Sequence, residues 1–348
     1  MNTTSEPIQW GVIGCGDVVK RKSGPAFHQS DRSDIYAVVS SDGTSAEAYA
    51  TAHDVPIATA DVDRVITDPD VDAVYVATPP NTHKEYTIAG AEAGKPVLVE
   101  KPLGLSAVEA KAMVEACGTS ETELFVAYYR RFHPQIQKMR CILDDGAIGN
   151  PTHAFVDYSF PTPADSGWRE SPAVSGGGWF VDATSHRLDL LVSLLGPPQS
   201  VTGTVRPRGE DPPVEAVVSL SSLMSDEVLC TVVSDFADAS SSDAFRIHGT
   251  RGSITTTALD EGTFSYEMPG ETGTIACEMP DAPHDGLIAH VEAVLLDGAR
   301  NQCAGHSALQ TEVLLDAGVR QMYADAIPAD VWSTEDGDVT AFLQRDST

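Results

Sequence analysis

A glycine-containing turn directly after the first predicted strand constrains this chain more than any other feature of its sequence. Ile8–Ile13 is a short apolar run, and it leads into Gly14-Cys15-Gly16. In a strand–turn–helix unit the first glycine permits the tight turn, and the second lets the backbone approach a pyrophosphate at the helix N-terminus. Val19 stands where the pattern G-x-G-x-x-G has its third glycine. The context therefore predicts a dinucleotide site and makes a bare glycine-rich turn the weaker interpretation.

The first 125 residues alternate strand-like and helix-like stretches, a pattern typical of a parallel, doubly wound Rossmann sheet. We therefore expect a dinucleotide-binding Rossmann domain over residues 1–125. The predicted strands are Ile8–Ile13, Ile35–Val39, Val71–Ala77, Pro96–Val99 and Leu124–Tyr128, and the predicted helices are Ser45–Ala52, Thr82–Ala93 and Ala107–Ala116.

The rest of the chain, residues 126–348, has a different pattern. Strand-like segments follow one another between Gly, Pro and Asp turns. This pattern predicts a C-terminal domain of the α+β class, with helices and a large, mostly antiparallel open sheet. The predicted strands are Ala154–Phe160, Ser200–Val205, Val214–Leu220, Val228–Ser234, Ala244–His248 and Ser253–Thr257, and the predicted helices are Pro134–Asp144, Phe180–Leu195, Gly286–Ala299 and Ser307–Tyr323.

The charge of the chain bears on its partners. Fifty-one acidic residues against twenty-two basic ones leave a net charge of −29 over 348 residues, and no lysine follows Lys138. A uniform negative field disfavours nucleic acid and anionic membranes as partners. Molar salt, with a Debye length of about 3 Å, screens such self-repulsion. The composition therefore favours a protein adapted to high salt over an acidic mesophilic enzyme.

The cysteines and the N-terminus indicate the compartment. The six cysteines are scattered without a CxxC pair, which favours a reducing cytoplasm and neither a disulfide framework nor a zinc site. The sequence has no apolar run of membrane-spanning length, and MNTTSEPIQW has neither a basic n-region nor an apolar h-region. We therefore expect a cytoplasmic protein without a membrane helix or a secretory signal.

The end of the second predicted strand, Val38–Asp42, is the position that selects between NAD and NADP. Ser40 leaves room for a 2′-phosphate, but Ser41 stands where an arginine would pair with that phosphate. Asp42 either reaches the ribose or shapes the turn. On balance these residues favour NADP, and use of both cofactors stays open.

Two more loops follow strand ends, where open parallel sheets bind ligands. Thr78-Pro79-Pro80-Asn81 is a candidate contact to the cofactor, or a proline-stiffened loop that caps the next helix. Lys101 either stabilises negative charge on a substrate oxygen or is a surface lysine in a turn. The expected cofactor contacts are Gly14, Cys15, Gly16, Asp17, Val18, Ser40, Ser41, Thr78, Pro79, Asn81, His83, Glu100 and Lys101.

A glycine triplet, Gly176–Gly178, precedes a helix that carries an acid–histidine pair. Asp182 and His186 are one helical turn apart on the same face. Histidine shuttles protons near neutrality, and a neighbouring carboxylate raises its pKa and orients it. A lone histidine on such a helix is more often structural than catalytic. The catalytic interpretation therefore depends on the partner acid and on the Rossmann half of the chain. A zinc site formed by Asp182, His186 and one of His28, His53 or His284 is a weaker interpretation, because no local ligand spacing supports a metal.

Together these motifs resemble the glucose–fructose oxidoreductase/inositol dehydrogenase (Gfo/Idh/MocA) family over nearly the whole chain. The resemblance implies a Rossmann domain, a C-terminal substrate and oligomerisation domain, and a catalytic set that falls on Lys101, Asp182 and His186. Val19 and Ser40-Ser41 depart from the pattern and leave the cofactor preference open. The resemblance rests on Gly11–Gly16, Ala77–His83, Glu100–Leu103, Tyr129–Pro134 and Gly176–Asp189 in that order.

The function implied by the resemblance is NAD(P)-dependent hydride transfer with a sugar or polyol hydroxyl, with an aldose oxidised at C1 as the leading substrate. A trans-dihydrodiol or other non-sugar dehydrogenase and a catalytically silent NAD(P)-binding sensor are the alternatives. A homodimer or homotetramer is expected, because a sheet face without a helical cover favours assembly. The expected substrate contacts are Lys101, Arg169, Asp182, His186 and His284, and Arg131, Trp168 and Arg187 are further candidates.

Overall fold

The computed structural model describes residues 6–163, 166–209, 213–237 and 241–323. Contacts divide the chain into two compact units. The first unit consists of Met1–Leu103, Lys111–Tyr129 and Pro280–Gly305, and the second of Gly104–Ala110, Arg130–Met279 and His306–Thr348. Residues 280–305, which the sequence assigns to the C-terminal domain, thus make their contacts in the first unit. Residues 324–348 of the expected C-terminal domain lie outside the described residues.

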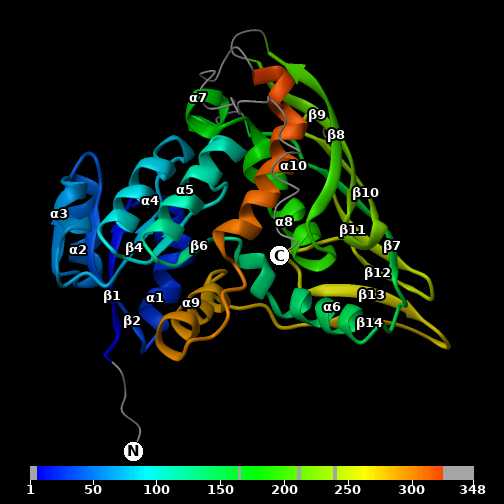
Figure 1. Ribbon diagram of the computed structural model, residues 1–348, viewed down its shortest axis with the longest axis horizontal. Coiled ribbons are helices and arrows are strands. Elements are labelled where there is room, and N and C mark those ends of the chain that lie inside the picture. The colour runs from blue at the N-terminus through cyan, green and yellow to red at the C-terminus, as the bar shows by residue number, and fades with distance from the viewer. Residues whose placement is uncertain (1–5, 164–165, 210–212, 238–240, 324–348) are drawn as a thin grey trace, which may run out of the picture. The chain divides into compact units, whose positions relative to one another are not determined.

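The first unit contains a six-stranded parallel sheet with the order β3-β2-β1-β4-β5-β6 (Figure 1). This is the Rossmann order, and it reverses between β1 and β4, the point where such sheets bind ligands. The doubly wound sheet predicted from the sequence is confirmed, and the half-buried three-residue strand β3 adds to it. The strands are β1 Ile8–Ile13, β2 Ser33–Val39, β3 Ile57–Thr59, β4 Ala73–Val76, β5 Val97–Val99 and β6 Leu124–Val126.

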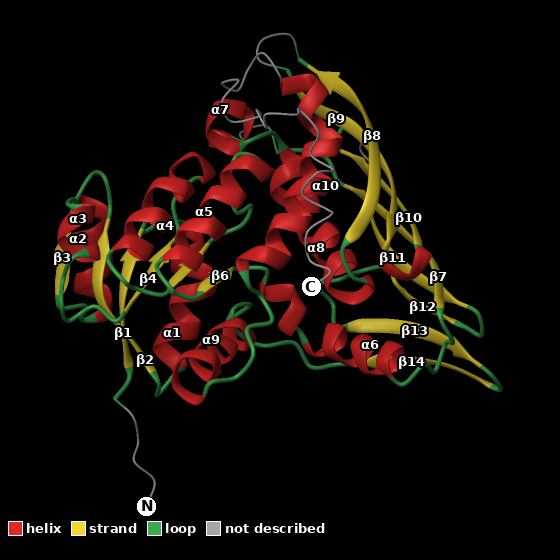
Figure 2. Ribbon diagram, viewed as in Figure 1, coloured by secondary structure: helices red, strands yellow, loops and turns green. Residues whose placement is uncertain are grey.

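Helices flank this sheet (Figure 2). Helices α1 and α9 contact each other, and Ser30 at the end of α1 donates a 2.5 Å hydrogen bond to Glu292 of α9. An exposed ion pair of 2.8 Å between Arg32 and Asp297 adds to this contact. These contacts explain why α9 belongs to the first unit. The helices here are the π-helical turn η1 Val19–Ser23, α1 Gly24–Gln29, α2 Thr44–His53, α3 Val62–Ile66, the 3₁₀ turn η2 Pro80–Thr82, α4 His83–Glu92, α5 Ala107–Thr119 and α9 Asp285–Asp297, and residues 107–110 of α5 belong to the second unit.

The second unit contains an eight-stranded sheet with the order β14-β13-β12-β11-β7-β10-β9-β8. Every pair of neighbouring strands is antiparallel except β7 and β10, so the predicted mostly antiparallel sheet is confirmed. Two strands that the sequence analysis did not predict, β13 and β14, extend its edge. The strands are β7 Pro151–Ser159, β8 Pro198–Arg208, β9 Val214–Met224, β10 Leu229–Asp235, β11 Ser242–Gly249, β12 Ser253–Thr256, β13 Thr263–Met268 and β14 Glu271–Ala276.

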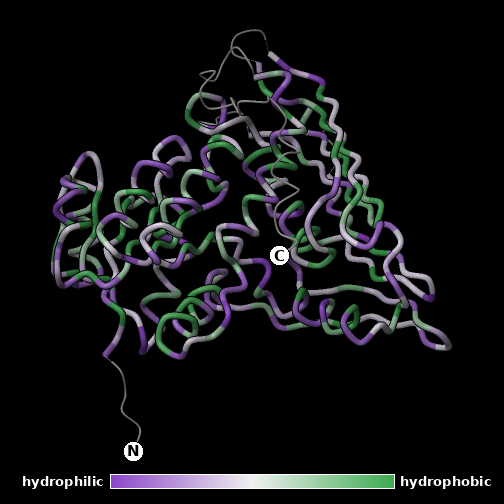
Figure 3. Tube along the Cα trace, viewed as in Figure 1, coloured by the Kyte–Doolittle hydropathy of each residue, from purple (hydrophilic) through white to green (hydrophobic). Residues whose placement is uncertain are grey.

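One face of this sheet packs on helices, and no helix of the described residues covers the other face (Figure 2). Side chains alternate accordingly along β7, where Ala154 and Val156 are buried and Phe155 between them is 40% exposed. Strands β4, β5 and β6 of the six-stranded sheet are buried at every residue and are continuously apolar (Figure 3). The helices of the second unit, apart from the first residues of η3 and α10, which belong to the first unit, are the 3₁₀ turns η3 Tyr129–Phe132, η4 Gly167–Glu170 and η6 Ser225–Glu227, the π-helical turn η5 Phe180–Thr184, α6 Pro134–Asp144, α7 Pro172–Ser175, α8 Ser185–Leu195 and α10 Gly305–Tyr323.

Among the helices of the described residues, none combines the length and the apolar composition that crossing a membrane requires.

Candidate active site

The glycine turn lies where the strand order of the first unit reverses. Gly14 follows β1 with φ +110°, and a Cβ on it would lie 2.5 Å from the carbonyl oxygen of Ala77, directly after β4. Only glycine allows both this conformation and this approach. A Cβ on Gly16, in contrast, would meet no atom within 4 Å, and Gly16 is exposed. Open space beside a helix N-terminus at the switch point fits a dinucleotide pyrophosphate.

The residues around Gly16 differ in their accessibility. Cys15 is buried, and its thiol points at the carbonyl oxygen of Val39 at 3.6 Å. Burial raises the pKa of Cys15 to about 11, so the side chain is a neutral thiol that packs in the core. Asp17 is exposed and Val18 half-buried, so both remain accessible beside the turn.

The turn after β2 is organised by Asp42. Its carboxylate accepts hydrogen bonds from the Ser40 hydroxyl at 2.9 Å, the Ser45 backbone at 3.0 Å and the Ser45 hydroxyl at 3.1 Å. These bonds, first the one from the Ser45 backbone, lower the pKa of Asp42. Asp42 therefore shapes the turn, one of the two alternatives left open by the sequence. Its fixed negative charge suits a ribose hydroxyl better than a 2′-phosphate and counts against the preference for NADP.

His83 ties two of the predicted loops together. It is fully buried at the start of α4, with Nε2 2.8 Å from the carbonyl oxygen of Thr78 and Nδ1 2.9 Å from that of Pro102. Burial lowers the pKa of His83. Thr78 also accepts a 2.7 Å hydrogen bond from Thr82, whereas Asn81 is exposed. His83 thus connects the loop after β4 to the segment that carries Lys101.

Glu100 is buried beside Lys101. It accepts a 2.7 Å hydrogen bond from the hydroxyl of Tyr75, and the same oxygen lies 4.0 Å from Nε2 of His284. Burial raises the pKa of Glu100. His284 packs on Tyr129, with ring centroids 4.6 Å apart. The structure thus brings the expected substrate contact His284 together with Glu100 inside the first unit, and Lys101 is half-buried next to them in the chain.

The second unit carries the acid–histidine segment. Asp182 is 9% exposed and His186 5%, and the chain between them passes from the π-helical turn η5 into α8. The sequence predicted a regular helix here, and π-turns of this kind are frequent at functional sites. Gly178 donates a 2.9 Å hydrogen bond to the Glu215 carboxylate, with which a Cβ on Gly178 would clash. The absence of a side chain at Gly178 therefore lets the chain lie close to Glu215 of β9.

Arg169 is the partner of Asp182. Its Nε lies 2.6 Å from the Asp182 carboxylate, and the guanidinium carbon lies 4.5 Å from the ring centre of Trp168 and 4.9 Å from that of Trp179. Arginine is always charged, so this contact is a charge-assisted hydrogen bond. The sequence pointed to Arg169 as a substrate contact but not to its bond with Asp182, which joins residues thirteen apart.

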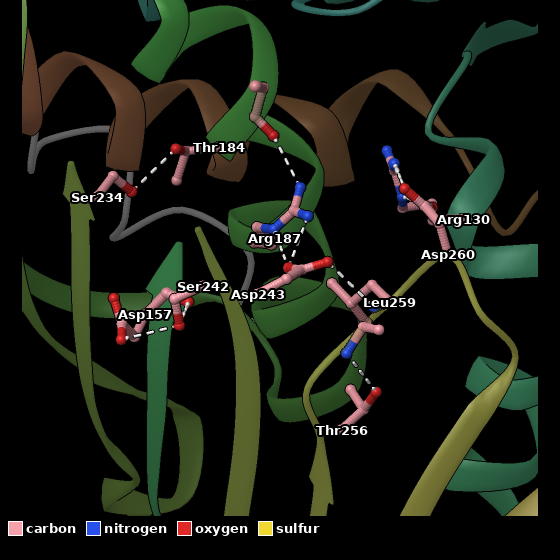
Figure 4. Close-up of polar contacts among 12 residues, drawn as sticks. Arg130, Asp157, Thr184, Arg187, Ser234, Ser242, Asp243, Thr256, Leu259 and Asp260 are labelled. Carbon is pink, nitrogen blue, oxygen red and sulfur yellow. Dashed lines mark hydrogen bonds and ion pairs between the residues drawn. The ribbon is translucent and has the colours of Figure 1, made fainter. Parts of the chain in front are cut away.

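Buried ion pairs fix the helix that carries His186. Arg187 binds Asp243 through Nε at 2.8 Å and through its terminal nitrogen at 2.6 Å, and Asp243 also accepts a 3.1 Å bond from the backbone of Leu259 (Figure 4). Arg131 binds the buried carboxylate of Asp189 at 2.8 Å. Arg131 and Arg187, considered as pocket residues, therefore use their charges to position α8. A similar pair, Arg130–Asp260, lies in the same view.

An aromatic row leads away from Arg169. Trp179 packs edge-on against Phe160 at 5.2 Å, and Phe160 lies 5.4 Å from Tyr158. Tyr158 and Phe160 line a groove of about 410 Å³, together with Asp243 and Thr257. The row Trp168, Trp179, Phe160 and Tyr158 thus runs from the Arg169–Asp182 pair to this groove.

The histidines weighed for a metal site have other neighbours. His28 stacks on His53, with ring centroids 4.5 Å apart, and its Nε2 lies 3.1 Å from the hydroxyl of Tyr49. In the part of the chain that the structure describes, no three His, Cys, Asp or Glu side chains are grouped as metal ligands.

The strand order and the glycine turn define a dinucleotide-binding enzyme fold. Residues 8–128 match the model of the oxidoreductase family with an NAD-binding Rossmann fold, and residues 136–255 match the GFO/IDH/MocA C-terminal domain. An oxidoreductase of Formosa agariphila is 30% identical over 316 residues, which cover 89% of this chain and 97% of the relative. The chain belongs to the Gfo/Idh/MocA oxidoreductase family and is an NAD(P)-dependent oxidoreductase, which confirms the resemblance seen in the sequence.

Two other relatives extend the comparison. The 1,5-anhydro-D-fructose reductase of Ensifer adhaerens is 30% identical over 263 residues, which cover 71% of this chain and 74% of the relative. The crystal structure of the aldose–aldose oxidoreductase of Caulobacter crescentus has the same fold, with a TM-score of 0.82 and 23% identity over 92% of this chain and 98% of that one.

Proposed function

We propose that this oxidoreductase transfers a hydride between NAD or NADP and a carbon that bears a hydroxyl group in a sugar or polyol, with an aldose oxidised at C1 as the leading substrate. The observation that carries the proposal is the buried Asp182–His186 segment, tied to Arg169. The relatives named for anhydrofructose and aldose chemistry support the same substrate class.

In this proposal each residue of the predicted catalytic set has one task. NAD(P), when bound through the turn at Gly16, supplies the hydride acceptor. His186 takes the hydroxyl proton as the substrate carbon loses its hydride, so that an alcohol becomes a carbonyl and the proton stays on the imidazole. Lys101 stabilises the negative charge that develops on the substrate oxygen. Asp182, held by Arg169, accepts a hydrogen bond from His186 or from a neighbouring hydroxyl.

A trans-dihydrodiol dehydrogenase is the second candidate. The same acid–base set would serve it, and the aromatic row from Trp168 to Tyr158 favours it, because aromatic faces suit a cyclic, partly apolar diol. Turnover of a cyclic trans-diol without turnover of any monosaccharide would select this candidate.

The test is the change in nicotinamide absorbance with a panel of aldoses, polyols and cyclic diols, using NAD and NADP. We expect H186A to lower kcat by about 10²–10⁴-fold while calorimetry gives unchanged NAD(P)H affinity. The matched control is H153A, because His153 is exposed on β7. Equal activity of H186A and wild type would contradict the role of His186. Tight NAD(P)H binding without any turnover would indicate a sensor instead.

We further propose a cytoplasmic protein that works at high salt as a homodimer or homotetramer. Six free cysteines suit a reducing compartment, and the net charge of −29 suits high salt. Phe155 and Leu229, the latter 62% exposed, lie on sheet strands and favour burial against a second copy. Sedimentation as a monomer at all salt concentrations would contradict the assembly.

A further inference from the structure

The guanidinium of Arg169 is held by three neighbouring side chains. Its Nε is bonded to Asp182, and two indole rings lie within 5 Å of its central carbon. Over the described ranges, its two terminal nitrogens donate no hydrogen bond to protein, and the side chain is 31% exposed. A guanidinium held in this way presents its remaining N–H groups in a fixed direction.

The charge around Arg169 selects a neutral ligand. A carboxylate or phosphate would bind an isolated guanidinium, but here Asp182 already balances the charge at 2.6 Å. A second anion would be repelled by Asp182 and by the net charge of −29. A hydroxyl group, in contrast, accepts a hydrogen bond from Arg169 and donates one to a carboxylate, so it satisfies both members of the pair.

The position of the pair relates this hydroxyl to the reacting one. Asp182 and His186 are four residues apart on one helical segment, so the group read by Arg169 lies beside the hydroxyl from which His186 takes its proton. The half-exposed ring of Trp168 and the row from Trp179 to Tyr158 offer apolar faces to a ring-shaped substrate.

We propose that Arg169 is a specificity-determining residue that selects cyclic substrates with a second hydroxyl next to the carbon that is oxidised, that is, ring-shaped vicinal diols. The proposal rests on the proposed function and narrows it. Pyranose sugars oxidised at C1, cyclic polyols and cyclic trans-diols all contain this unit, whereas simple alcohols and 2-deoxy sugars lack it.

The test compares substrates with and without the second hydroxyl. The two pairs are trans-1,2-cyclohexanediol with cyclohexanol, and D-glucose with 2-deoxy-D-glucose. In wild type we expect kcat/KM to favour the diol of a pair by about 10- to 100-fold, the ratio for a hydrogen bond to a charged group. In R169Q this preference disappears, because the diol loses its advantage while the mono-alcohol is affected much less.

Two further variants make the result specific. R32Q is the matched control, since it breaks an exposed Arg–Asp pair of 2.8 Å in the first unit, and it keeps the preference. R169K keeps the charge but loses the planar fork, so it also loses the preference, and it serves if melting curves find R169Q unfolded.

An equal loss on both members of each pair in R169Q would overturn the proposal, because Arg169 would then act only through Asp182. If wild type reduces neither cofactor with any probe, the proposed function fails. In that case calorimetry replaces the kinetic readout: the same substrate pairs are titrated into wild type and R169Q in the presence of NADH or NADPH. A preference for the diol in binding that R169Q removes supports the role of Arg169. No binding, or no preference, overturns it.

Discussion

Substitution of the two turn glycines by alanine separates folding from cofactor binding. In G14A, the backbone of the new residue must keep φ near +110°, and its Cβ would lie 2.5 Å from the Ala77 carbonyl oxygen. The backbone strain costs about 1–3 kcal/mol, and the overpacking about another 1–3 kcal/mol. We therefore expect G14A to lower the free energy of unfolding by about 2–6 kcal/mol, a large part of what holds a domain folded.

G16A differs because its Cβ meets nothing within 4 Å and the backbone there is not left-handed. Its free energy of unfolding should stay within about 1 kcal/mol of wild type, with stabilisation as the expected sign. The same methyl group fills the space through which a pyrophosphate approaches the helix N-terminus, so we expect NAD(P)H affinity to fall by at least about tenfold.

Urea unfolding without cofactor gives the first quantity for both variants, and calorimetric titration with NADH and NADPH gives the second. The reasoning is refuted if G16A binds both cofactors as tightly as wild type, or if G14A unfolds at the urea concentration of wild type. Equal destabilisation of the two variants would also refute it, since the structure gives only Gly14 a steric conflict.

Two other predictions concern charge. Asp316 is buried in the second unit and accepts a 3.0 Å bond from the backbone of Ala107; burial raises its pKa from 3.8 to about 7. The native state therefore keeps a proton that the unfolded chain has lost, and the contribution of Asp316 to stability falls by about 1 kcal/mol per pH unit as pH rises from about 4 to about 7. In D316N this component is absent, so urea unfolding at several pH values should give a stability gain over wild type that grows through this window and levels off above it; parallel curves would contradict the assignment. For the whole chain, with its charge of −29, the melting temperature should rise from dilute to molar KCl because the Debye length shrinks to about 3 Å, and a flat response would contradict adaptation to salt.

The buried strands of the parallel sheet and the glycine turn that follows the first of them could be predicted from the sequence. Strands β1, β4, β5 and β6 are nearly continuous apolar runs, since both faces of a parallel sheet are buried, and the turn at Gly14 shows where they bind a ligand. The short strand β3 and the edge strands β13 and β14 were missed. β3 has three half-buried residues, and β14 is mostly exposed, so hydrophobic periodicity is weak in both.

Assignment of α9 to a unit could not be predicted in the same way. Its sequence indicates a helix, and the structure has one at Asp285–Asp297. What ties it to α1 is a pair of side-chain contacts, Ser30–Glu292 and Arg32–Asp297, between residues more than 260 positions apart. Propensity and periodicity are local quantities and contain no information about such long-range pairs.

A long-range contact that the sequence pattern does not contain also matters for the chemistry of the candidate site. Spacing alone made Asp182 the partner of His186, where a carboxylate is expected to raise the pKa of the histidine and to orient it. The structure adds Arg169, whose permanently charged guanidinium lies 2.6 Å from that carboxylate. Under the proposed function the substrate proton goes to His186, since the Asp182 carboxylate is already bound by Arg169. In that proposal Asp182 and Arg169 together hold the neighbouring hydroxyl, which links the acid–base step to the choice of substrate.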